Sequence, residues 1–218
     1  MKTKNILIEL IERLNDYELE AQQTGTTVNM TDFLGYLNSR YVHESVTSRE
    51  LGGDFKNYEP EEGNGQNTDI SILIVLLFRY AKGYIKKALK DSMIKTADEF
   101  SFLITLLTFD SLSKTELIQK QVMEKTSGTE IINRLLKLGL LEQYQDEVDK
   151  RSIRVKISPS GRVELFKILP QMRTVSQIVA GNLTVNEKNM LAYMLRKLEH
   201  FHNDIYLNKK DNNLEELI

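Results

Sequence analysis

Apolar residues recur along this chain in stripes that have mostly the period of an α-helix. They repeat every three or four positions at about 4–21, 32–43, 69–92 and 184–206, which places them on one face of an amphipathic helix. The glycine-rich, acidic stretch 52–68 has no such period and predicts a flexible loop. We therefore expect a mainly α protein in which an N-terminal helical extension, 1–51, is set apart from the rest.

The predicted helix at 69–95 is apolar nearly all round in its first half. The run from Ile70 to Phe78 is far shorter than the ~20 residues that span a bilayer, so we expect no membrane segment. Such a helix must instead be buried, either in its own core or against a partner subunit.

Three short helices are predicted next. Thr96-x-x-Glu99 and Ser113-x-x-Glu116 are capping boxes, in which the hydroxyl and the carboxylate each satisfy a free backbone N–H. A third helix begins near Thr126–Ser127 and ends at Gly139, because glycine readily adopts the left-handed conformation of a C-terminal cap.

Two segments, 140–144 and 152–157, then read as strands joined by a polar turn. Ser158-Pro159 opens a further helix, with a bend expected at Pro170. The order of helices, hairpin and helix predicts a winged helix-turn-helix lobe at 96–169 with a two-stranded β-hairpin wing, followed by C-terminal helices at 170–218.

A winged helix-turn-helix inserts its second helix into the DNA major groove. At the start of that helix Ser127, Gly128 and Thr129 are small enough to permit close approach, and Asn133 and Arg134 have the length to contact bases or phosphates. Ser127 and Thr129 could also cap the helix.

Four basic residues mark the wing, and no acidic residue lies between the first of them and Arg162: Lys150, Arg151, Arg154 and Lys156. A plain solvated face is the alternative to DNA contact.

The charge and composition narrow the functions further. The charges of the 29 basic and 31 acidic residues nearly cancel, but residues 1–69 contain 6 basic and 13 acidic residues and are therefore acidic.

The absence of cysteine excludes disulfides and thiolate chemistry. With no signal peptide visible, we expect a cytoplasmic protein. No catalytic motif stands out, and His200 and His202 do not share a helix face, so we expect no enzyme, no cofactor and no metal site.

Residues 69–207 resemble the MarR family of bacterial transcription regulators. The resemblance is carried, in order along the chain, by Leu112-Ser113-Lys114-Thr115-Glu116-Leu117, Leu135-x-x-x-Gly139-Leu140-Leu141, Asp149-Lys150-Arg151-Ser152, Val155-Lys156-Ile157-Ser158-x-x-Gly161 and Leu183-Thr184-x-x-Glu187.

The resemblance implies a homodimer, held by the helices at 69–95 and 170–218, that binds a pseudo-palindromic operator in double-stranded DNA. It implies that Asp149 orients or pairs with Arg151 in the wing. It also implies a small-molecule effector between the dimerisation helices and the DNA-binding lobe, near Tyr80 and Tyr84. A role in the core or in the subunit interface is the favoured alternative for these two tyrosines. Because the chain has no cysteine, we expect the effector to bind noncovalently.

Two residues depart from the family pattern. Glu130 places a carboxylate on the recognition helix, where it could accept a hydrogen bond from a cytosine or pair with Arg134 four residues on. Gln143 stands where the family usually has arginine. These departures leave a second hypothesis open, a winged-helix protein-interaction adaptor that does not bind DNA.

Overall fold

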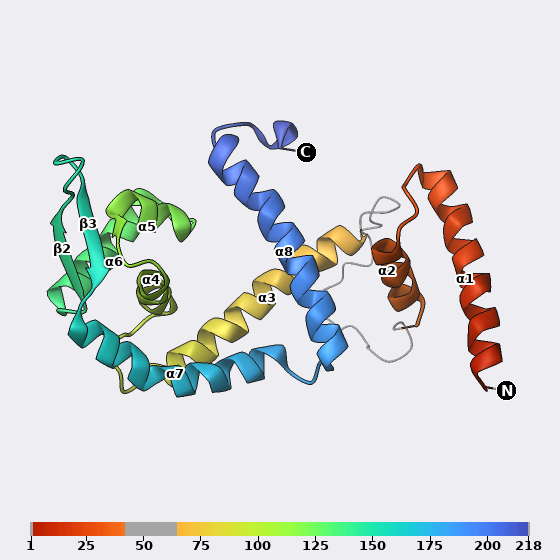
Figure 1. The fold of residues 1–218 in the computed structure, drawn as a ribbon, viewed down its shortest axis with the longest axis horizontal. Coiled ribbons are helices and arrows are strands. Elements are labelled where there is room, and N and C mark those ends of the chain that lie inside the picture. Colours follow the sequence, from red (N-terminus) through yellow and green to blue (C-terminus); the bar gives the residue numbers. More distant parts are fainter. Residues whose placement is uncertain (1, 42–64, 218) are drawn as a thin grey trace, which may run out of the picture. The chain divides into compact units, whose positions relative to one another are not determined.

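The computed structural model describes residues 2–41 and 65–217 and confirms a mainly helical protein (Figure 1). The chain divides into two units, one ending at Glu59 and one beginning at Pro60. The first contains α1 (Lys2–Thr24) and α2 (Met30–Tyr41). The second contains α3 (Gly65–Ala88), α4 (Ala97–Thr108), β1 (Leu112–Ser113), α5 (Lys114–Lys120), α6 (Lys125–Lys137), β2 (Leu141–Gln145), β3 (Ile153–Ile157), α7 (Pro159–Ala180), α8 (Val185–Asn208) and the short 3-10 helix η1 (Leu214–Glu216).

The first unit is a helical hairpin with a small aromatic core. The Tyr17 ring lies 5.5 Å from the ring of Phe33 and 5.5 Å from that of Tyr36. Much of the apolar stripe of α1 stays exposed in this unit, at Ile6, Leu7, Leu10 and Ile11. The reason is length, because the 12 residues of α2 can cover only about half of the 23-residue α1.

The winged lobe is built from the elements that the capping motifs predicted. Thr96 and Ser113 cap α4 and α5 as complete capping boxes with Glu99 and Glu116. Gly139 follows α6 with a φ of 69°, which confirms the left-handed cap. Helix α6 begins differently from the prediction: its N-cap is Glu124, which makes no side-chain capping bond. The expected capping role of Ser127 or Thr129 is therefore wrong.

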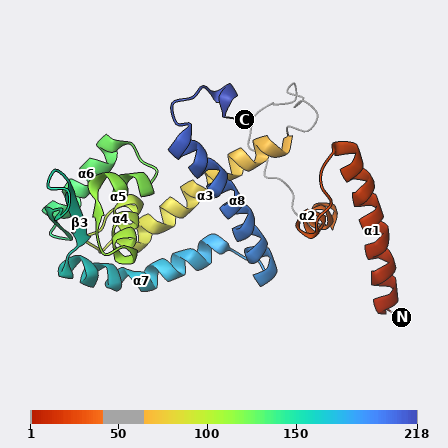
Figure 2. The same cartoon turned by 45° about the horizontal axis from the view of Figure 1, so that its top comes forward.

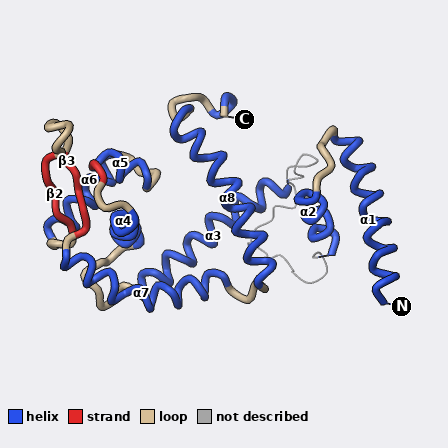
Figure 3. Tube along the Cα trace, viewed as in Figure 1, coloured by secondary structure: helices blue, strands red, loops and turns tan. Residues whose placement is uncertain are grey.

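The wing has one strand more than the sequence predicted. Strands β2 and β3 form the expected antiparallel hairpin, with Leu141 opposite Ile157, and β1 adds a short third strand on the other side of β3 (Figure 3). Two residues are too few for a periodic pattern to reveal a strand. Because β1 runs directly into α5, it joins the sheet to the first helix of the helix-turn-helix.

The core of the lobe lies where α4, α5, α6 and α7 meet the inner face of the sheet. Its fully buried side chains come from every one of these elements and include Phe102, Leu117, Ile132, Val155 and Leu165. Ile153 alternates in phase with Val155 and Ile157 along β3 but is 44% exposed, since it lies toward the tip of the wing.

Helices α7 and α8 extend from this lobe. Helix α7 packs along α3 and continues through Pro170, so the expected lobe boundary at 169–170 falls inside one helix (Figures 1 and 2). Gly181 ends α7, and the Thr184 capping box opens α8. At the far end of α8, the Tyr206 hydroxyl donates to the carbonyl of Met123, 3.4 Å away. No helix among the described residues is long and apolar enough to cross a membrane.

Candidate nucleic-acid interface

Helix α6 presents a polar face outward and an apolar face to the core. Ile131, Ile132 and Leu135 are buried, whereas Ser127 and Asn133 point to solvent. The Thr129 hydroxyl donates to the carbonyl of Lys125 at 2.7 Å, one turn back along the helix. The outward face therefore offers short polar side chains along the first turns.

Gly128 does not belong to that outward face, which corrects the prediction. It is buried, and a Cβ built at this position would lie 2.6 Å from Cγ1 and 2.9 Å from Cγ2 of Ile118 on α5. Glycine is needed here for the close approach of α5 and α6. The sequence showed that a small residue was required but not which neighbour required it.

Arg134 forms an ion pair inside the protein rather than with Glu130. Its Nε lies 3.0 Å from Oε1 of Glu99, whose side chain is 4% exposed while that of Arg134 is 52% exposed. Oε2 of Glu99 accepts the backbone N–H groups of Lys95 and Thr96. Arg134 thus joins the recognition helix to the start of α4, and part of its guanidinium still faces solvent.

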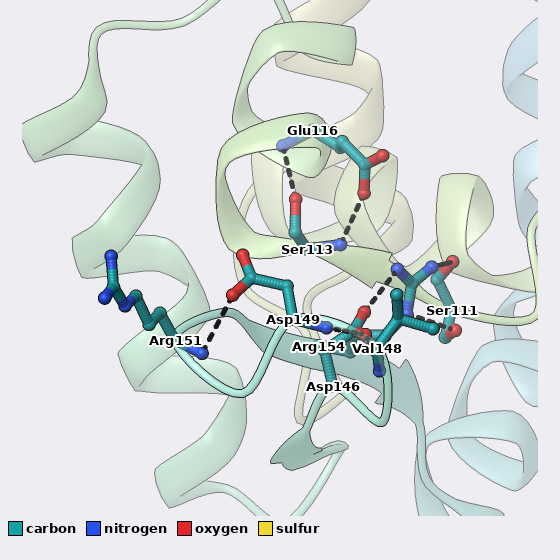
Figure 4. Close-up of polar contacts among 8 residues, drawn as sticks. All are labelled: Ser111, Ser113, Glu116, Asp146, Val148, Asp149, Arg151 and Arg154. Carbon is teal, nitrogen blue, oxygen red and sulfur yellow. Dashed lines mark hydrogen bonds and ion pairs between the residues drawn. The ribbon is translucent and has the colours of Figure 1, made fainter.

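The turn of the wing is organised by two aspartates. Oδ1 of Asp146 accepts the backbone N–H groups of Val148 (2.8 Å) and Asp149 (3.0 Å), and Oδ1 of Asp149 accepts the N–H of Arg151 (3.0 Å). Asp149 therefore orients Arg151 through its backbone. The Arg151 side chain extends away from this network (Figure 4), and Lys150 is exposed beside it.

Arg154 is committed to contacts within the protein. Nη1 lies 3.0 Å from Oδ2 of Asp146, and Nε and Nη2 donate to the hydroxyl and the carbonyl of Ser111 (Figure 4). The N–H groups of Asp149 and Val148, followed by the Arg154 guanidinium, lower the pKa of Asp146, and the Asp146 carboxylate raises the pKa of Arg154. Arg154, which was predicted to contact DNA, thus has three of its five N–H groups engaged within the protein, and its side chain is 28% exposed.

Lys156 on β3 forms an ion pair with a residue of the neighbouring strand β2. Its Nζ lies 3.2 Å from Oε2 of Glu142 across the β2–β3 pair and 5.8 Å from the ring centroid of Tyr144. Gln143 lies on β2 opposite Val155. Of the four basic wing residues, Lys150 and Arg151 are therefore the two whose side chains make no ion pair among the described residues.

The sequence prediction missed Glu99, Ser111 and Asp146 as residues that shape this surface. Asp146 had a recognisable signal, because an aspartate at the start of a polar turn commonly accepts the backbone N–H two residues on. Glu99 was recognised only as a capping residue, and nothing in the sequence links Ser111 to Arg154.

Tyr80 and Tyr84 line a hollow of about 140 Å³ between α3 and α7, together with Leu77, Ala81, Ile178 and Val179. The structure thus brings the two predicted effector-site residues to one cavity. Among the described residues no group of three or more histidine, aspartate or glutamate side chains could hold a metal ion.

The chain has the architecture of a winged helix-turn-helix protein, and comparisons with known proteins narrow this class. Residues 95–153 match the model of the MarR family. The transcriptional repressor NicR of Pseudomonas putida is 28% identical over 103 residues, which are 47% of this chain and 65% of NicR. The chain thus spans slightly less than two thirds of that curated relative.

Two solved structures share the fold. Bordetella bronchiseptica BpsR, described with regulation of its DNA binding by 6-hydroxynicotinic acid, superposes with a TM-score of 0.56 at 22% identity and covers 60% of this chain and 98% of its own. A cysteine-to-serine variant of Escherichia coli MarR bound to operator DNA superposes with a TM-score of 0.57 at 21% identity. The match covers 63% of this chain and 99% of the MarR chain. The protein thus has a winged-helix fold, and within it residues 95–153 are similar to the MarR family.

Proposed function

We propose that the protein is a homodimeric, sequence-specific DNA-binding transcription regulator whose activity a small molecule modulates. The observation that carries the proposal is the outward polar face of α6 beside a wing that presents Lys150 and Arg151 to solvent. Such a surface places a helix in the major groove and cations at the flanking phosphates. The MarR-family domain and the operator complex of the similar E. coli protein support this use.

The DNA-binding part is tested by titrating a labelled fragment of the promoter region beside the gene at several salt concentrations. We expect affinity to fall steeply with salt, and the logarithmic slope to decrease by about 0.9 for each phosphate contact removed. Arg151→Ala should weaken binding and reduce the slope by about one contact. Arg173→Ala is the matched control, because Arg173 is an exposed arginine on α7. It should change neither the affinity for DNA nor the salt slope. Absent or salt-insensitive binding at low salt contradicts the proposal.

The dimer is inferred from apolar surface that one chain leaves uncovered. Helix α8 has no buried residue within this chain. Large side chains that are 40–60% exposed follow α3, at Ile70, Ile72, Leu73, Ile74, Val75, Leu77 and Phe78. An exposed apolar patch of this extent is typical of a subunit interface. Light scattering should show a dimer that Phe78→Asp dissociates and that Val148→Asp, at an exposed wing position, leaves intact.

The effector proposal rests on the hollow at Tyr80 and Tyr84 and on the similar protein BpsR, whose DNA binding is regulated by 6-hydroxynicotinic acid. The volume of this hollow, about 140 Å³, is below the ~300–1,000 Å³ of most ligand pockets. We therefore infer that a partner subunit contributes the remaining wall of the pocket. With 6-hydroxynicotinic acid as the probe, release of DNA from the wild type but not from Tyr84→Ala supports this site. Equal release from both proteins contradicts it.

A protein-interaction adaptor that does not bind DNA is the second candidate. Two observations favour it. Arg134, Arg154 and Lys156 each form an ion pair with a carboxylate of the same chain. Glu130 is exposed on α6, where its negative charge would repel phosphates. Charge reversal at Lys150 and Arg151 separates the two candidates. It should abolish operator binding by a regulator, and it should leave an adaptor's regulatory effect in cells unchanged.

A further inference from the structure

One guanidinium connects the three strands of the wing sheet. Arg154 lies on β3, Asp146 directly follows β2, and Ser111 directly precedes β1. The three contacts of Arg154 are 3.0 Å to Oδ2 of Asp146, 3.0 Å to the Ser111 hydroxyl and 2.8 Å to the Ser111 carbonyl. These directional, charge-assisted bonds hold β1 and the end of β2 to the same point on β3.

The same carboxylate also shapes the turn that carries the free cations. While Oδ2 of Asp146 binds Arg154, its Oδ1 accepts the N–H groups of Val148 and Asp149. Asp149 in turn accepts the N–H of Arg151. A continuous series of hydrogen bonds therefore runs from Ser111 through Arg154 and Asp146 to the backbone of Arg151 (Figure 4).

The series reaches the helix-turn-helix at its other end. Ser113 pairs with Arg154 in the β1–β3 register and is also the N-cap of α5, where its hydroxyl accepts the N–H of Glu116. The wing turn and the first helix of the helix-turn-helix are thus attached to a shared strand, β1. Relative motion of the two requires breaking the contacts of Arg154.

We propose that Arg154 and Asp146 are positioning residues, which hold the wing turn in the one arrangement that directs Lys150 and Arg151 to DNA. This inference rests on the proposed DNA-binding function. A free polar turn samples many conformations, and ordering it at the moment of binding would cost conformational entropy. The contacts of Arg154 order it beforehand, so a larger fraction of the protein is competent to bind.

The sign of the effect separates positioning from simple electrostatics. Removal of a carboxylate from a surface that faces DNA strengthens binding if the carboxylate acts only through its charge. If Asp146 positions the turn, Asp146→Ala weakens operator binding despite the lost negative charge, by about tenfold for one charge-assisted hydrogen bond. Glu142→Ala is the matched control, because Glu142 is an exposed carboxylate on β2 whose one ion pair, within the part of the chain that the structure describes, is with Lys156. It should leave the affinity unchanged or raise it.

A double-mutant cycle tests whether Asp146 acts through the wing cations. In the background of Lys150→Ala and Arg151→Ala, Asp146→Ala should have little further effect, since nothing remains to be positioned. Ser111→Ala, which removes one contact of Arg154 without any change of charge, should weaken binding in the same direction but less. Wild-type or higher affinity of Asp146→Ala, or a loss that adds fully to that of the cation variants, overturns the proposal.

A measurement without DNA keeps this inference separate from the proposed function. Amide hydrogen exchange of Val148 and Asp149 should accelerate in Asp146→Ala, while the amides of the core helices keep their protection, which also shows that the variant folds. Unchanged exchange in the wing turn overturns the positioning role. If exchange accelerates but the wild type binds no DNA, the DNA-binding proposal fails and the wing contacts stand.

Discussion

Gly161 offers the sharpest test of how α7 is attached to the winged lobe. A Cβ at this position would lie 2.1 Å from the carbonyl oxygen of Leu140 and 3.0 Å from Cγ1 of Ile157. Carbon–oxygen contacts are ordinarily no closer than about 3.3 Å, so Gly161→Ala must move α7 away from the start of β2 by roughly 1 Å. The φ of Gly161 is not left-handed, so backbone conformation alone does not penalise alanine.

That movement breaks hydrogen bonds as well as packing. The N–H of Ser158 donates to the carbonyl of Leu140 at 3.1 Å, and the hydroxyls of Ser158 and Ser160 both donate to the carbonyl of Gly139 at 2.6 Å. Overpacking costs about 1–3 kcal/mol, and each lost hydrogen bond about 0.5–1.5 kcal/mol. Alanine recovers about 1 kcal/mol of helix propensity. We expect a net loss of about 3 kcal/mol in the free energy of unfolding.

The assay is thermal and urea unfolding followed by circular dichroism. For a unit of this size, about 3 kcal/mol corresponds to a fall in Tm of roughly 6–12 °C. Gly83→Ala is the matched control, because a Cβ at Gly83 on α3 meets no atom within 4 Å. It should leave stability unchanged or raise it by up to ~1 kcal/mol. A Gly161→Ala protein as stable as the wild type, or two variants that shift stability in the same direction, would refute the packing argument.

Three further predictions follow from the contacts of the lobe. Gly128→Ala should displace α6 from α5 and reduce both stability and operator affinity, and Ile118→Ala should relieve part of that loss in the double variant, as measured by unfolding and titration. Phe102→Ala, at a fully buried position, should cost about 3–5 kcal/mol in urea unfolding, and a cost below ~1 kcal/mol would show that the site is not packed. The N–H of Met93 and the hydroxyl of Ser92, at 2.7 and 2.8 Å, lower the pKa of Glu164 below its ordinary value of 4.5. The ionised Glu164 carboxylate should therefore contribute fully to the free energy of unfolding above pH 4.5, and this contribution should disappear as the pH falls through its lowered pKa in the folded protein. Glu164→Gln should accordingly be less stable than the wild type at pH 7 and approach it in acid.

The sequence predicted the local elements of the lobe because their signals are local. The capping boxes at Thr96, Ser113 and Thr184, and the left-handed glycine at 139, depend on groups within four residues of one another. The alternating strands and the wing motif also lie in continuous segments. Local chemistry of this kind can be recognised without knowing what packs against it.

The sequence could not show which of the predicted DNA contacts are free, because the partners are distant along the chain. Glu99 engages Arg134 from 35 residues away and Ser111 engages Arg154 from 43 residues away. Gly128, chosen as a surface residue for its small size, is small because Ile118 lies against it. The sequence by itself determined the resemblance to the MarR family, the local elements and the position of the basic wing. Only the tertiary structure decided which cations face outward, because ion pairing and close packing depend on separation in space.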